Sequence, residues 1–208
     1  MARTRRPEAR PEEILDAALA VFTDVGFAAA RVEDIAARAG LSKGAVYVYF
    51  ESKHALLTAL VRRLADRVVG AAEALVESAA ADPEQTLRQL LTFIVTQVSD
   101  PKISAAPRLV IAESQRFPEI GAMYREAVLA RVRRLITRLC ARGVAQGVFR
   151  DINPDVLLRM CGGPIVAHMF LTTVFADPAA PGPSPEIIAG GIADMVLNGL
   201  KVRQEKAP

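Results

Sequence analysis

The stretch VEDIAARAGLSKGAVYVYF, from Val32 to Phe50, decides the fold, because its pattern is that of two short helices joined by a tight turn. Gly40 lies at the bend, where the chain needs a left-handed backbone that strains other residues. Ser42 stands where its side chain would cap the second helix. The apolar spacing predicts the following inward-facing residues: Ile35, Ala36, Ala39, Leu41, Val46 and Tyr49.

This pattern is typical of a helix-turn-helix, whose second helix enters the major groove of DNA. That helix is predicted over Lys43–Tyr49, with an outward face made of Lys43, Gly44, Ala45, Tyr47 and Val48. An ordinary helical hairpin is the alternative, since alanine-rich helices with a glycine between them are common. We favour DNA binding because every constrained position of the motif is matched at once.

The chain from about Glu13 to Leu60 resembles the DNA-binding end of the TetR family of bacterial transcriptional regulators. The resemblance is carried, in order, by Ile14, Leu15, Ala17, Ala18, Phe22, Gly26, Phe27, Ile35, Ala36, Ala39, Gly40, Ser42, Gly44, Tyr47, Tyr49, Phe50, Lys53 and Leu56. A second segment, RLVIAESQRFPEI from Arg108 to Ile120, resembles part of the C-terminal domain in one branch of the family. That second match implies no particular ligand.

The resemblance implies an all-α protein of about nine helices. Residues 1–54 would form a three-helix DNA-binding domain, and residues 55–208 a helical domain for effector binding and dimerisation. The expected DNA contacts are Arg31, Ser42, Lys43, Gly44, Ala45, Tyr47, Tyr49 and Lys53. The expected partners are a roughly palindromic double-stranded operator and a second copy, joined through the last two helices. Dimerisation is also expected on separate grounds, because a protein with two-fold symmetry reads the two half-sites of such an operator.

One position departs from the family pattern. The family usually has Thr immediately before the second helix, where it caps the helix and touches a phosphate, whereas this chain has Arg31. Losing such a cap costs about 1 kcal/mol. Glu33 and Asp34, near the start of the same helix, would offset part of that cost through the helix dipole.

Composition permits nucleic-acid binding without requiring it. The 208 residues are 51% hydrophobic and 24% charged, with a net charge of +3. Cys140 and Cys161 form no C-x-x-C pair, and only two histidines are present, so we expect reduced cytoplasmic thiols and no metal site or cofactor. No G-x-S-x-G or H-E-x-x-H motif occurs, which leaves a helical enzyme as the weakest alternative.

The N-terminal segment MARTRRPEAR has no apolar region and is not predicted to be a signal peptide. Arg3, Arg5 and Arg6 are either a solvated tail or a DNA-contacting arm. The longest apolar run, Ile165–Ala176, is shorter than the roughly 20 residues of a membrane span, so we expect a buried helix and no membrane partner.

Helix starts are marked clearly by proline. A long helix from Lys53 to about Ala80, capped by Ser52, would link the two domains. Later helices are predicted to begin at Pro83, Pro107, Pro118, Pro154 and Pro185, and Pro164 should kink the one that contains it. No stretch alternates with the period of a strand, so no sheet is expected.

Two features of the C-terminal part leave alternatives open. The arginines at 131, 134, 138 and 142 form a stripe along one predicted helix, interpreted as a solvated face rather than a second nucleic-acid surface. The expected lining of a pocket for an apolar or aromatic effector is Leu60, Leu64, Phe93, Arg108, Met123, Tyr124 and His168. His168 fits a hydrogen-bonded core histidine better than a ligand contact, and a DNA-binding protein without an effector is the runner-up function.

Overall fold

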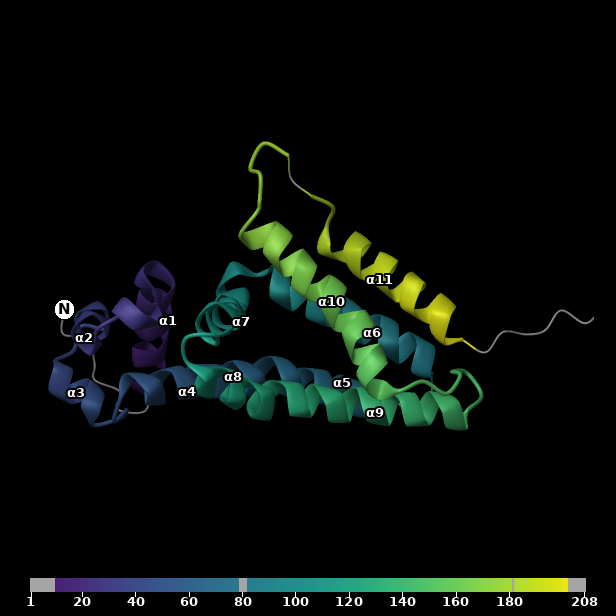
Figure 1. The fold of residues 1–208 in the computed structure, drawn as a ribbon, viewed down its shortest axis with the longest axis horizontal. Helices are drawn as coiled ribbons and strands as arrows, with labels where there is room; N and C mark the ends of the chain where they lie inside the picture. The colour runs from purple at the N-terminus through teal and green to yellow at the C-terminus, as the bar shows by residue number, and fades with distance from the viewer. Residues whose placement is uncertain (1–9, 79–81, 181, 202–208) are drawn as a thin grey trace, which may run out of the picture. The chain divides into compact units, whose positions relative to one another are not determined.

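The computed structural model describes residues 10–78, 82–180 and 182–201, and the described chain is all α (Figure 1). Counting each run that continues through a π-helical turn as one helix, these residues form nine helices, the predicted number. The chain divides into two compact units. Unit 1 is the chain up to Leu64 together with Ala105–Arg125, and unit 2 is Ala65–Ser104 together with the chain from Glu126. The functional boundary at residues 54 and 55 stays a prediction.

Unit 1 is built around the first four helices. α1 (Arg10–Ala29) packs against α2 (Val32–Arg38) and α4 (Lys53–Leu64), and α3 (Lys43–Tyr47) packs against α2. Gly26 interrupts α1, with φ 78° and ψ 158°, and one further turn follows it. The side chains that fill this core include Ile14, Ala18, Phe22, Phe27, Ile35, Val46, Leu56 and Leu57.

α7 (Pro101–Glu113) corrects the prediction that a helix begins at Pro107. Asp100 opens α7 instead, because its carboxylate accepts from the Lys102 N–H at 2.8 Å and Pro101 takes the first turn. Pro107 lies inside the helix and removes a single backbone donor. Residues on the inner face of α7 are buried, which offsets that loss: Ile103, Ala105, Ala106, Leu109 and Val110.

Two long helices each consist of two α-helical parts joined by a π-helical turn. α4 continues through the π-helical turn η2 (Ala65–Val69) into α5 (Gly70–Ser78), capped at its start by Ser52 as predicted. Its predicted end at Ala80 lies outside the described residues. α8 (Pro118–Tyr124) likewise continues through η3 (Arg125–Leu129) into α9.

Unit 2 is organised around α6 (Pro83–Ser99). α9 (Ala130–Ala145), α10 (Pro154–Thr173) and α11 (Pro185–Leu200) all pack against it, and α10 and α11 lie side by side along it (Figure 1). The predicted helix starts at Pro83, Pro154 and Pro185 are confirmed, and the preceding Asp82, Asn153 and Ser184 each accept from a backbone N–H of the first turn. The core includes Leu87, Leu91, Val95, Leu135, Leu139, Phe149, Leu157 and Leu197.

α10 is not the buried helix that the sequence predicts. It continues through Pro164 to Thr173, and its Met160, Leu171 and Val174 are 55%, 63% and 50% exposed. By length and mean hydropathy, 1.3, it is the one helix among the described residues that meets the criteria for a membrane span. Its packing on α6, α9 and α11 and its buried His168 make it part of the folded unit rather than a span.

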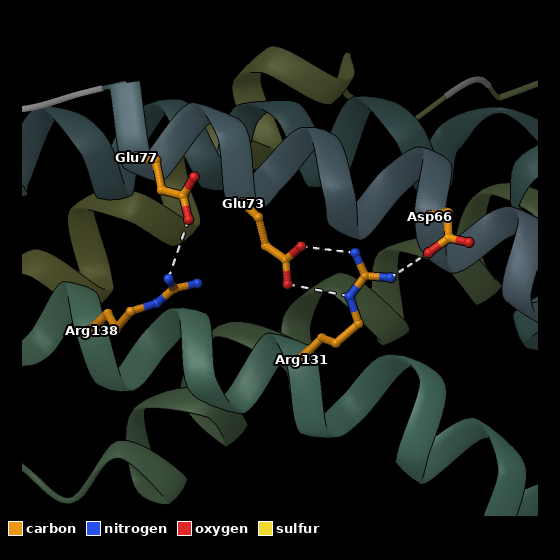
Figure 2. A network of polar contacts seen from close by, with 5 residues as sticks. All are labelled: Asp66, Glu73, Glu77, Arg131 and Arg138. Carbon is orange, nitrogen blue, oxygen red and sulfur yellow. Dashed lines mark hydrogen bonds and ion pairs between the residues drawn. The ribbon is translucent and has the colours of Figure 1, made fainter.

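The arginine stripe of α9 is only in part the solvated face that was expected, because Arg134 and Arg138 are exposed whereas Arg131 and Arg142 are half-buried. Figure 2 shows Arg131 held between Asp66 and Glu73, at 2.7 and 2.8 Å, and Arg138 facing Glu77 at 3.2 Å. Arg142 donates to the Val76 carbonyl of α5 at 3.1 Å. Arg131 and Arg138 thus pair with acids of their own unit, and Arg142 with a backbone carbonyl.

Candidate nucleic-acid interface

The turn between α2 and α3 has the geometry that a helix-turn-helix needs. Gly40 has φ 68°, in the left-handed region, and the next residue returns a hydrogen bond from its N–H to the Ala36 carbonyl at 2.9 Å. The Ser42 side chain accepts from the Ala45 N–H at 3.2 Å and so caps α3. Three predictions about this turn are therefore confirmed: its position, the left-handed conformation of Gly40 and the Ser42 cap.

The inward residues of the motif match the prediction except at its end. Ile35, Ala36 and Val46 are buried, and Ala39 and Leu41 are half-buried. Tyr49 is 41% exposed and corrects its interpretation as a core residue. The reason is that α3 ends at Tyr47, two residues before the predicted end. Tyr49 therefore lies beyond the helix and is not on its inward face.

The outward face of α3 is open to solvent. Lys43 and Gly44 are exposed, Tyr47 is 43% exposed and Val48 is 79% exposed. A side chain at Gly44 would meet nothing within 4 Å, so this position leaves room for another molecule to approach the backbone closely. Ala45 is half-buried and contributes mainly through the backbone. The face combines one cation, one aromatic ring and an open backbone.

A carboxylate stands beside the cation of this face. Lys43 Nζ lies 2.8 Å from Glu33 Oε1, and Arg31 Nε lies 3.9 Å from Glu33 Oε2. The hydrogen bond from Lys43 lowers the pKa of Glu33, and the same bond raises the pKa of Lys43. Arg31 precedes α2 without capping it through its side chain, in keeping with the departure noted in the sequence.

Lys53 is tied to the protein rather than extended into solvent. Its ammonium donates to the carbonyls of Ala28 and Ala30 at 3.0 Å each and lies 4.7 Å from the Phe27 ring centroid. Burial lowers its pKa, and the nearby Glu113 opposes that effect. Two of its three protons are therefore used to hold the end of α1, and its predicted phosphate contact would use the third.

Glu113, from α7, reaches the same corner of unit 1. Its Oε1 accepts a hydrogen bond from the Phe27 N–H at 3.0 Å. Without it, this N–H would be unpaired, because the helix is broken at Gly26. The rings of Phe27 and Phe117 pack edge to face at 5.4 Å. The sequence carried no signal for this contact, because Phe27 and Glu113 are 86 residues apart.

The residues expected to line an effector pocket fall in both units. Leu60, Leu64, Arg108, Met123 and Tyr124 belong to unit 1. Phe93 and His168 belong to unit 2, where Phe93 is half-buried against the core of that unit. Leu60 is fully buried in the core, whereas Leu64 is half-buried. Their role as pocket residues stays a prediction.

His168 has the features of a satisfied core histidine. It is 6% exposed, and its Nε2 lies 2.9 Å from the Ser99 hydroxyl oxygen. That hydroxyl donates to the Val95 carbonyl at 2.7 Å, so it accepts from His168 and places the ring proton on Nε2. Burial lowers the pKa of His168, which favours the neutral ring.

The remaining chemistry-bearing residues do not form a second site within the described chain. Cys140 and Cys161 are buried free thiols, and burial raises the pKa of Cys161 to about 12. No group of three or more His, Cys, Asp or Glu residues suited to a metal occurs among the described residues. Arg3, Arg5 and Arg6, the predicted basic arm, lie outside them.

Comparison with known proteins assigns the two parts of the chain. A family described as bacterial regulatory proteins, tetR family, matches residues 14–60, and the tetracyclin repressor-like C-terminal domain matches residues 82–181. The transcriptional repressor NicS of Pseudomonas putida is 30% identical over 72% of this chain and 70% of its own. The chain belongs to the TetR family.

Other TetR-family members match over nearly the full length. The regulator EthR of Mycolicibacterium smegmatis is 27% identical over 95% of this chain and 90% of its own. A crystal structure assigned to the family, from Mesorhizobium loti, superimposes with a TM-score of 0.74 and 25% identity over 95% of this chain and all of its own. The protein is thus a TetR-type transcriptional regulator, and the exposed face of α3 belongs to the domain that the family uses for DNA.

Proposed function

We propose that the protein is a homodimeric one-component regulator that represses transcription by binding a roughly palindromic operator and is released by a small-molecule effector. The observation that carries the DNA-binding part is the capped, solvent-exposed α3 that follows the left-handed Gly40. In a helix-turn-helix, such a helix enters the major groove and reads base edges. On this proposal Lys43 and Tyr47 contact bases or phosphates. The DNA backbone is contacted and positioned by Arg31, Ser42, Tyr49 and Lys53.

The proposed dimer rests on exposed apolar faces of α10 and α11. Along α10, exposed residues recur every three or four positions at Val156, Met160, Gly163, Ala167, Leu171 and Val174. Along α11, Ile187 and Met195 are 67% and 82% exposed, with Gly191 between them. Side chains added at Gly163 or Gly191 would meet nothing within 4 Å of their own chain. A second copy packed on these faces would bury them in a four-helix arrangement.

Replacing Lys43 by alanine tests the proposed recognition face. The variant should bind operator DNA more weakly, and its plot of log affinity against log salt should flatten by about one unit if Lys43 contacts one phosphate. If Lys43 contacts a base edge instead, the loss should be confined to particular operator sequences. Fluorescence anisotropy titrations at several salt concentrations distinguish these two outcomes.

The matched control for this test is Lys102→Ala. It removes the same charge from an exposed lysine at the start of α7, which is not part of the helix-turn-helix. If the two variants bind every DNA sequence equally well at every salt concentration, Lys43 is not part of the DNA interface.

The effector part of the proposal concerns the helix that runs from α4 through η2 into α5. An effector that binds one arrangement of this helix more tightly than another would change the separation of the two recognition helices. A tenfold release of DNA requires about 1.4 kcal/mol of differential affinity. Apolar and aromatic compounds are the first to screen, by loss of operator binding.

Leu64→Trp tests where that effector acts, because Leu64 is half-buried near the end of α4. Adding an indole there should either mimic the effector or block it. The compound concentration that releases half of the DNA should therefore shift at least severalfold, while circular dichroism shows a folded protein. Unchanged operator affinity together with an unchanged release curve would place the effector elsewhere.

A regulator without a small-molecule effector is the second candidate. No specific contact among the described residues favours it, and it predicts that no compound in the screen alters operator binding. Catalysis receives no support from the relatives, which are transcriptional regulators.

A further inference from the structure

One carboxylate on the candidate interface faces both nearby cations. Glu33 Oε1 accepts from Lys43 at 2.8 Å, and its Oε2 lies 3.9 Å from Arg31 Nε. Arg31 precedes α2 and Lys43 opens α3, so a single side chain bridges the starts of the two helices of the motif. The three side chains are exposed, at 44% for Glu33, 52% for Lys43 and 72% for Arg31.

This bridge has little to contribute to the stability of the fold. Ion pairs between solvent-exposed side chains are screened by water and salt and typically add little to stability. The turn is already specified by Gly40, the Ser42 cap and the buried Val46. The carboxylate therefore has its main consequence for whatever approaches Lys43 and Arg31 from solvent.

DNA approaches these cations with phosphates and with base edges, and the two differ in what they need from Lys43. A phosphate is an anion that competes directly with the Glu33 carboxylate for the ammonium. A base edge offers neutral acceptors, such as O6 and N7 of guanine, which two of the three ammonium protons can reach while the third stays on Glu33. The bridge can thus persist in a base contact, whereas a phosphate contact brings a second anion next to the Glu33 carboxylate and weakens the bridge.

We infer that Glu33 is a specificity-determining residue, which holds Lys43 away from backbone phosphates and leaves it oriented toward bases. Binding to random DNA depends almost wholly on phosphate contacts, so it bears the full cost of the repulsion between the phosphate and Glu33. Binding to the operator retains the bridge and bears little of that cost. The inference rests on the proposed DNA-binding function.

The test compares Glu33→Gln with Asp34→Asn in the full-length protein. Both variants remove one negative charge from the first turn of α2, but Asp34, unlike Glu33, forms no ion pair with another of the described residues. The probes are a random-sequence duplex and the fragment recovered by selection from genomic DNA. Each is titrated by anisotropy between roughly 50 and 200 mM salt, the range over which phosphate contacts are most visible.

Glu33→Gln should bind the random duplex more tightly than Asp34→Asn does, with a salt dependence steeper by about one unit for each phosphate gained. When salt is lowered fourfold, from 200 to 50 mM, one additional phosphate contact makes the resulting gain in affinity about 3.5-fold larger than without that contact. Affinity for the selected fragment should change less, so the ratio of specific to random binding should fall. In a Lys43→Ala background most of the effect should disappear, because Lys43 is the nearer cation.

Equal salt slopes for Glu33→Gln and Asp34→Asn would overturn the inference, as would a Glu33→Gln gain that is the same on both duplexes. Either result would leave the DNA-binding proposal intact, because wild-type binding is measured in the same experiment. Wild-type protein that binds neither duplex at the lowest salt would instead overturn the proposed function itself.

Discussion

Replacing Met195 by arginine is expected to convert the proposed dimer into monomers and to weaken operator binding steeply. Met195 is 82% exposed on α11 and lies one helical turn from Gly191 and two from Ile187, on one apolar stripe. In a two-fold interface each substitution appears twice, so two guanidinium groups would be brought together in an apolar contact. Truncating or mispairing buried interface charges costs about 2–5 kcal/mol, which corresponds to a dissociation constant raised at least about thirtyfold.

Sedimentation equilibrium over a range of protein concentrations measures this change directly. Val144→Arg is the matched control, because it places arginine at a partly exposed valine of α9, off the stripe. Gly191→Leu should weaken the dimer in the same assay by keeping the two helix faces apart, since the position is open in the single chain. A Met195→Arg dimer as strong as that of Val144→Arg would show that α11 does not form the interface.

Replacing Gly143 by alanine is expected to destabilise unit 2 strongly, because the added methyl group would overlap the ring of Phe149. An alanine Cβ at this position would lie 2.0 Å from Cδ2 of Phe149 and 2.6 Å from two further ring carbons. Phe149 is 2% exposed within the core of unit 2, so its ring cannot turn outward without opening the core. The chain is held in place there, because Val148 and Phe149 both donate from their N–H groups to the Gly143 carbonyl.

Overpacking of this kind costs about 1–3 kcal/mol and occasionally more. At about 2–4 °C per kcal/mol for a chain of this size, the melting temperature should fall by roughly 6–12 °C for a 3 kcal/mol loss. Thermal unfolding must be followed at one fixed protein concentration, because a dimer's melting temperature depends on it.

Gly70→Ala is the control for the glycine test. Its Cβ would lie 3.6 Å from a guanidinium nitrogen of Arg131, an ordinary contact, and it also lies within a helix. It should leave stability unchanged or raise it by about 0.4–1 kcal/mol through the loss of unfolded-state entropy. Equal melting temperatures for the two variants would mean that Phe149 can move aside at no cost.

The elements that could be predicted from the sequence depend on neighbours within a few residues. Asn153 and Ser184 each precede a proline and an acid, so the starts of α10 and α11 were predicted to the residue. Gly40 and Ser42 are equally local, since one supplies a left-handed backbone and the other bonds three residues ahead. Pro107 misled because proline marks a helix start only where nothing earlier has already begun one.

The features that could not be predicted depend on contacts between distant segments. Arg131 pairs with acids 58 and 65 residues earlier, and periodicity shows that arginines share a face without showing what the face meets. The contact of Phe149 with Gly143 depends on how the chain turns after α9. Glu33 lies ten residues before Lys43, across a turn, where no spacing rule of a single helix applies. The exposure of Lys43, Gly44 and Tyr47 could therefore be predicted from the sequence, the electrostatics around them could not, and the DNA contacts themselves stay a prediction.

Selection of bound genomic fragments, followed by footprinting and determination of the number of chains bound, tests the proposed function most directly. A dimeric helix-turn-helix regulator should enrich a sequence with two half-sites related by two-fold symmetry, their centres about 34–36 Å apart or a multiple of that distance. Each such site should bind an even number of chains, and Met195→Arg should lose the protection of both half-sites together. Failure to enrich any sequence, or a single unsymmetrical footprint bound by one chain, would contradict the proposal.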